Sequence, residues 1–164
     1  MSQIIQLPAS ATGRFDVHAL DRHAPPIRTD GVYVVHTSIE DTLAAVTVAD
    51  RLATAMSVPL TLVHFRAVPY QLPVDVPVGV SPVETDGFVA RLRDEGFDVR
   101  VQVLLCRDER QTIPLAFKRH SLIVLAGRHR RWPTQVERLR RWLEAAGHFV
   151  VFVDTSERKE PSRA

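Results

Sequence analysis

Five short apolar runs, rich in β-branched and aromatic residues, recur along the chain and are typical of buried strands. They are Gly31–His36, Pro59–Phe65, Asp98–Leu105, Ser121–Ala126 and His148–Val153. The third run differs from the others because its valines alternate with Arg100 and Gln102. Such alternation leaves one face of a strand partly wet, and this suits a strand at the edge of a sheet.

The segments between these runs carry apolar residues at helical spacing. Three of them open with the pattern of a capping box, in which a hydroxyl and a Glu side chain bond the first backbone amides of a helix. The three boxes are Thr37–Glu40, Ser81–Glu84 and Thr134–Glu137. A further helix is expected over Asp108–His120, although Pro114 requires either that its first turn is separate or that it starts late.

Strands separated by helices predict right-handed crossovers and an α/β fold. We expect a five-stranded doubly wound parallel sheet with helices on both faces and, counting the five runs along the chain, the order 3-2-1-4-5. The fifth strand, His148–Val153, would then be the second edge, yet it is apolar on both faces. An uncovered apolar edge promotes aggregation. Pairing with its twin across a two-fold axis would cover it, so we predict a homodimer.

The two ends of the chain lack sustained periodicity. We expect a flexible leader over residues 1–30, with one short strand at Gln3–Gln6 docking on the body, one domain over residues 31–154, and a disordered polar tail over residues 155–164. Inside the domain, Arg66–Val80 contains three prolines and fits neither a helix nor a central strand.

Composition supports this single-domain view. The chain has 164 residues, enough to bury one sizeable core. Its longest apolar runs are of strand length, well short of the roughly 18 residues that a membrane span needs, and no signal peptide is recognisable. Cys106 is the single cysteine and can form no internal disulfide, so we expect a reducing cytoplasm.

The order of these elements, together with Ser121–Gly127 (SLIVLAG), resembles the universal stress protein family over about residues 31–154. The resemblance implies an adenine-nucleotide α-hydrolase-like sheet, dimers through the last strand and, in many members, ATP held by a glycine signature. Gly127 matches the first glycine, but Arg130 stands where the second would be, and the closing Gly-Ser or Gly-Thr pair is missing. Arginines can bind phosphate through their side chains, so we expect ATP or AMP, if either binds, to meet a rebuilt phosphate loop.

In an open parallel sheet, ligands bind beyond the carboxyl ends of the strands where the strand order reverses. Here that place lies between the first and fourth strands. The residues expected there are His36, Thr37, Ser38, Val63, His64, Gly127, Arg128, His129, Arg130, Arg131 and Thr134. His64 is more simply interpreted as a hydrogen-bonded core residue than as a ligand, and Cys106 as a small buried hydrophobe than as a nucleophile. Neither a metal-ligand spacing nor a nucleophile with its base is recognisable.

Charge is unevenly placed. Residues 118–141 hold eight basic side chains against one acidic side chain, a net charge of +7 in a chain whose total is +2. Such a segment attracts anions, although its structural alternative is a solvated loop. We therefore expect a non-catalytic, dimeric module resembling universal stress proteins that binds an anionic small molecule or a nucleotide through its Arg-rich loop. The alternatives are a stress protein that binds ATP or AMP, and a nucleic-acid binder that uses residues 118–141, which is disfavoured because no aromatic platform accompanies the charge.

Overall fold

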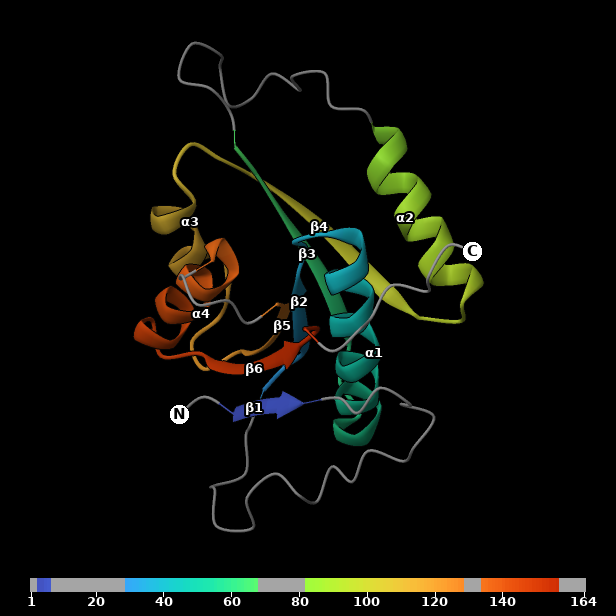
Figure 1. The fold of residues 1–164 in the computed structure, drawn as a ribbon, viewed down its shortest axis with the longest axis horizontal. Helices are drawn as coiled ribbons and strands as arrows, with labels where there is room; N and C mark the ends of the chain where they lie inside the picture. The colour runs from blue at the N-terminus through green and yellow to red at the C-terminus, as the bar shows by residue number, and fades with distance from the viewer. Residues whose placement is uncertain (1–2, 7–28, 68–81, 129–133, 157–164) are drawn as a thin grey trace.

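The computed structural model describes residues 3–6, 29–67, 82–128 and 134–156. In these residues six parallel strands form one sheet in the order β1-β6-β5-β2-β3-β4 (Figure 1). The strands are β1 Gln3–Gln6, β2 Val32–Val35, β3 Leu60–Ala67, β4 Val99–Cys106, β5 Leu122–Gly127 and β6 Phe149–Asp154. The helices are α1 Ile39–Met56, α2 Pro82–Asp94, α3 Glu109–Ala116 and α4 Gln135–Ala145.

The five expected strands are present in the expected order. β2 lies at the centre between β3 and β5, with Val32 opposite both Leu60 and Leu122. All six residues of β5 are buried, as the doubly apolar run predicts. β4 is an edge strand, as the third run predicts. The expected dry face is missing from the middle of this strand, because Val101, Val103 and Leu105 are exposed, as are Arg100 and Gln102.

A short N-terminal strand completes the sheet. β1 pairs in parallel with the outer edge of β6, from Gln3 opposite Val151 to Gln6 opposite Asp154. This is the short strand expected within the leader. It changes the argument for a homodimer, because the edge that we expected a twin to cover is covered by the same chain. Among the described strands, β1 and β4 are now the edges.

Helices cover both faces of the sheet. α1 and α2 pack on one face, where Val34, Leu52 and Leu92 belong to a single buried cluster. α3 and α4 pack on the other face through a second cluster that includes Ile113 and Leu143 (Figure 1). The doubly wound architecture therefore follows from two separate apolar cores on one sheet.

Two helix boundaries differ from the expectation. The N-cap of α1 is Ser38, not Thr37, because the Ser38 hydroxyl accepts the amide of Asp41. α3 begins at Glu109 and ends at Ala116, so the expected extension to His120 is wrong. Pro114 lies inside the helix, where its missing N–H weakens the ladder of hydrogen bonds, and the helix ends two residues later.

Other boundaries match closely. Pro82 is the first residue of α2, as expected for proline at a helix start. Thr134 caps α4 by accepting the amide of Glu137. The described residues do not include the expected cap residue Ser81, residues 68–80 of the Pro-rich segment, Trp132 or the tail beyond residue 156. In the described part of the chain, no helix has the length and apolar character that crossing a membrane requires.

Candidate functional site

A cavity of about 340 Å³ opens at the carboxyl ends of β2 and β3, next to the central strand at which the strand order reverses. Its wall is formed by the loop after β2, the first turn of α1, the C-terminal half of β3 and the start of α4. The lining residues are Val35, His36, Thr37, Ser38, Asp41, His64, Phe65, Gln135, Val136 and Leu139. The cavity therefore occupies the place where an open parallel sheet binds its ligands.

The loop after β2 supplies the polar part of the wall. The backbone amide of His36 donates to the carbonyl of Val63 at 2.8 Å, which continues the β2–β3 ladder beyond the end of β2. The amide of Thr37 donates to Oγ1 of Thr42 at 3.1 Å. Oγ1 of Thr37 itself is buried and has no hydrogen-bond partner among the described residues. A buried hydroxyl without a partner costs free energy, and this one belongs to a residue that lines the cavity.

Asp41 is the charged residue of this wall that sequence reasoning missed. Its Oδ2 accepts the hydroxyl of Ser38 at 2.8 Å, and its Oδ1 accepts the hydroxyl of Thr155 at 2.7 Å. Because Asp41 lies in the first turn of α1, the helix dipole also stabilises its negative charge. The carboxylate thus joins α1 to the segment after β6. The spacing Ser38-x-x-Asp41 could have predicted the contact between Ser38 and Asp41, but not the contact with Thr155.

His36 and His64 stack on one another at the cavity. Their ring centroids are 4.6 Å apart and their planes differ by 5°. Phe88 of α2 packs against His36 in a T-shaped arrangement, with the two ring centroids 5.8 Å apart. Burial lowers the pKa of both imidazoles, and each is lowered further by a neighbouring positive charge, that of His64 for His36 and that of Arg66 for His64. Burial and this repulsion both disfavour the protonated form of each ring.

The start of α4 forms the opposite wall. Gln135 and Val136 lie in its first turn and Leu139 one turn further on, so the positive end of the helix dipole faces the cavity. Thr134 does not line the cavity but holds this end in place as the N-cap. Neither Gln135 nor Val136 was among the expected site residues.

Gly127 has a packing role that the sequence did not reveal. A Cβ added to this glycine would lie 3.3 Å from Cγ1 of Val136. The glycine therefore lets the first turn of α4 pack against the end of β5. Its carbonyl also accepts the amide of Thr155 at 3.1 Å.

The remaining expected residues fall into three groups. Val63 is buried in the second core and does not line the cavity. Arg128 is exposed, with Nη2 3.8 Å from Oε2 of Glu40. The centre of the Arg-rich loop, His129, Arg130 and Arg131, lies outside the described residues. Of the expected residues, His36, Thr37, Ser38 and His64 are thus brought together.

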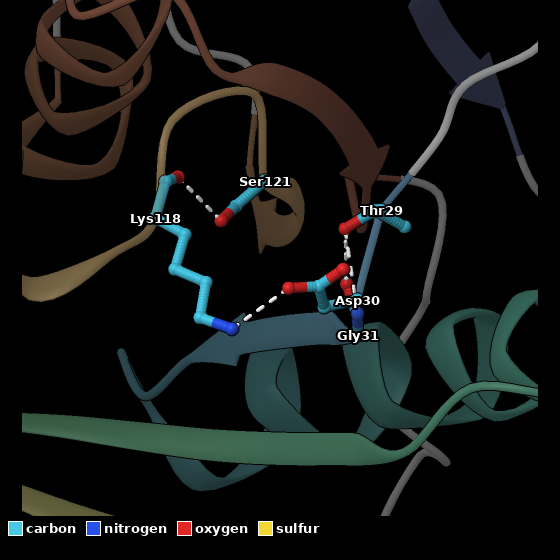
Figure 2. Close-up of polar contacts among 5 residues, drawn as sticks. All are labelled: Thr29, Asp30, Gly31, Lys118 and Ser121. Atoms are coloured by element: carbon cyan, nitrogen blue, oxygen red, sulfur yellow. Dashed lines mark hydrogen bonds and ion pairs between the residues drawn. The ribbon is translucent and has the colours of Figure 1, made fainter.

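The basic segment is divided between the two ends of the sheet. Lys118 precedes β5 and binds Asp30, before β2, with Nζ 2.7 Å from Oδ2 (Figure 2). This pairing raises the pKa of Lys118 and lowers that of Asp30. Arg128 follows β5 at the opposite end, and the guanidinium of Arg140 lies 5.5 Å from the ring centre of Phe152. Lys118 and Arg128 therefore lie at opposite ends of β5.

Comparison with known proteins adds no assignment. No protein-family model matches the chain, and no curated protein matches it. Within the described residues, no three His, Cys, Asp or Glu side chains are grouped as a metal site would require. Cys106 is buried, in keeping with its interpretation as a small core residue.

Proposed function

We propose that this protein is a non-catalytic module resembling universal stress proteins, which binds a small anionic molecule, with ATP or AMP as the leading candidates. The observation that carries the proposal is the cavity at the carboxyl ends of β2 and β3. Its volume of about 340 Å³ falls within the roughly 300–1,000 Å³ of small-molecule sites.

The chemistry of the wall favours a negatively charged ligand group. Two helices, α1 and α4, begin at the cavity, and helix N-termini attract anions through their free amides and dipoles. Asp41 supplies the one carboxylate among the described residues of the wall, and this carboxylate already accepts two hydroxyl groups at the start of its own helix. The apolar side chains of Phe65, Val136 and Leu139 provide a surface for a base or another flat group.

The arginines of the loop belong to this proposal by their place in the chain. Arg130 and Arg131 connect β5 to α4, whose first turn lines the cavity. Guanidinium groups in this loop would supply the positive charge that a glycine loop supplies through its amides.

A thermal-shift and mass-spectrometry experiment tests the proposal. The purified protein is denatured and its supernatant searched for a nucleotide, and the melting temperature is measured with ATP, AMP and inorganic phosphate. We expect ATP or AMP to raise the melting temperature by several degrees, because a ligand that binds only the folded state stabilises it by mass action. Absence of any shift or bound nucleotide would contradict the proposal.

Thr37→Val locates the site. The substitution removes a hydroxyl that has no partner among the described residues, so stability without ligand should stay nearly constant. Affinity for ATP should fall by about threefold to tenfold, which corresponds to the loss of one hydrogen bond. Thr61→Val, on β3 and outside the cavity lining, is the matched control. Equal affinities for the two variants would place the ligand elsewhere.

The homodimer is the second part of the proposal. Pairing through His148–Val153 requires β1 to leave the outer edge of β6, since one strand edge accepts one partner. We therefore propose that the dimer forms only when β1 is displaced.

A further inference from the structure

We propose that the stacked imidazoles of His36 and His64 receive the anionic group of the ligand, and that the site takes up one proton from the solvent when that group binds. This inference rests on the proposed function, since it concerns the same cavity. The inference gives the histidine pair a role in recognising the anion in addition to that of the Arg-rich loop.

The geometry brings both rings to the cavity by different routes. His36 follows β2 directly, and His64 lies within β3 one position beyond Val63, which is the register partner of Val35. The parallel ladder therefore sets the two histidines side by side, and their rings stack at 4.6 Å. Both side chains line the cavity, so a bound group has access to the pair.

The surroundings keep this pair uncharged until an anion arrives. Each ring is half-buried, and burial disfavours the charged form of an imidazole. Among the described residues, the neighbouring elements offer the pair little compensating negative charge. They contribute Arg66 on β3, Asp41 on α1, Phe88 on α2, Val103 opposite His64 on β4, and Gln135 on α4. Asp41 is the only acid in this set, and its oxygens are already engaged with Ser38 and Thr155.

An incoming phosphate or other oxyanion reverses this preference. A negative group near an imidazole raises its pKa and favours the protonated form. One ring then gains a proton from water, forming a second N–H bond that can donate to the ligand oxygen. The other ring stays neutral, because a second proton would set two like charges face to face. The site therefore binds the anion and one proton together.

Binding of ATP to the full chain at different pH values tests this coupling. We expect the affinity of the unmodified protein for ATP to rise about tenfold between pH 8 and pH 6, beyond the change that protonation of ATP alone causes. His36→Gln and His64→Gln should each reduce this pH dependence, since Gln keeps hydrogen-bonding groups but does not titrate. His120→Asn is the matched control, because His120 is exposed and outside the cavity lining.

Calorimetry in two buffers of different ionisation enthalpy counts the protons taken up per ATP. The contribution of ATP itself is common to all variants, so the difference between the unmodified protein and the Gln variants belongs to the histidines. Equal proton counts would overturn the inference while leaving the proposed function intact. No binding of ATP at any pH would overturn both.

Nuclear magnetic resonance of the imidazole protons keeps the inference testable if a Gln variant does not fold. The pKa of at least one of the two histidines in the unmodified protein should rise when ATP is added. Unchanged titration curves for both rings, with ATP bound, would contradict the inference.

Discussion

His148 is a buried polar residue whose ring nitrogens both lack a hydrogen-bond partner among the described residues. The side chain is 6% exposed and lies edge-on to Phe117, with ring centroids 5.7 Å apart. Burial lowers its pKa, and the positive charge of His120 lowers it further. The folded protein therefore holds His148 as a neutral, largely apolar ring.

This environment predicts a loss of stability in mild acid. Above the unfolded pKa of about 6.5, His148 is neutral in both states and contributes no pH dependence. Below it, the unfolded chain binds a proton that the folded protein does not, so the free energy of unfolding falls as pH falls. The decrease is at most about 1.4 kcal/mol per pH unit for this group. Urea unfolding at pH 7.5, 6.0 and 5.0 measures this decrease in the free energy of unfolding.

His148→Leu separates the contribution of this residue from that of the histidine pair at the cavity, whose pKa values are lowered too. At pH 7.5 the variant should be as stable as the unmodified protein or more stable, because it removes from the core two nitrogens that have no partner in the described part of the chain. Between pH 7.5 and 5.0 it should lose less stability. Parallel pH profiles for the two proteins would show that His148 is not the group responsible.

At the scale of elements, the contact of α4 with β5 fixes one wall of the cavity. Gly127 ends β5 and Val136 lies in the first turn of α4, and any side chain at residue 127 would press on Val136. Gly127 is not among the glycines with positive φ, so its backbone would accept alanine. The glycine is needed for the distance between the elements and not for its backbone conformation.

Gly127→Ala should therefore destabilise the protein by about 1–3 kcal/mol, as overpacking does. Val136→Ala gives the added methyl group room, so the double variant should be more stable than the sum of the two single effects predicts. The coupling energy, measured by urea unfolding in a double-mutant cycle, should be about 0.5–3 kcal/mol. If Gly127→Ala left stability unchanged but abolished ATP binding, the glycine would instead serve close approach of the ligand.

The elements themselves could be predicted because their signals are local. β-branched runs such as Ser121–Ala126 and the Thr134–Glu137 box depend on residues close in the chain, and both identified the right element. The α1 cap was misplaced by one residue because Thr37 and Ser38 both carry hydroxyl groups. The structure gives the cap to Ser38, while the amide of Thr37 bonds to Thr42.

The site was harder to predict because its contacts join distant parts of the chain. Both histidines were expected at the carboxyl ends of their strands, but their stacking follows from the β2–β3 register, which the sequence does not state. The role of Asp41 depends on Thr155, 114 residues further along. Gln135 and Val136 reach the cavity only because α4 packs where it does.

At the scale of the whole molecule, β1 decides what the sheet offers to a partner. β6 runs beside β5 on one side and β1 on the other, so its backbone is paired on both edges. The β1 ladder spans four residues, whereas the β5–β6 ladder spans six. A short edge strand is the easier of the two to displace, because it makes fewer ladder contacts. Release of β1 would expose an apolar strand edge that favours pairing with a second copy.

Deletion of residues 1–6 tests whether β1 prevents two copies of the chain from pairing through β6. The shortened chain should self-associate at micromolar concentration, since an open β6 edge can pair with its equivalent across a two-fold axis. Light scattering measures the mass, with the full chain as the control. Hydrogen exchange then locates the contact, because the β6 amides should stay protected in the associated form and exchange faster in the monomer. A shortened chain that stays monomeric would exclude pairing through β6, and a full-length dimer with β1 still paired would show that the interface lies elsewhere.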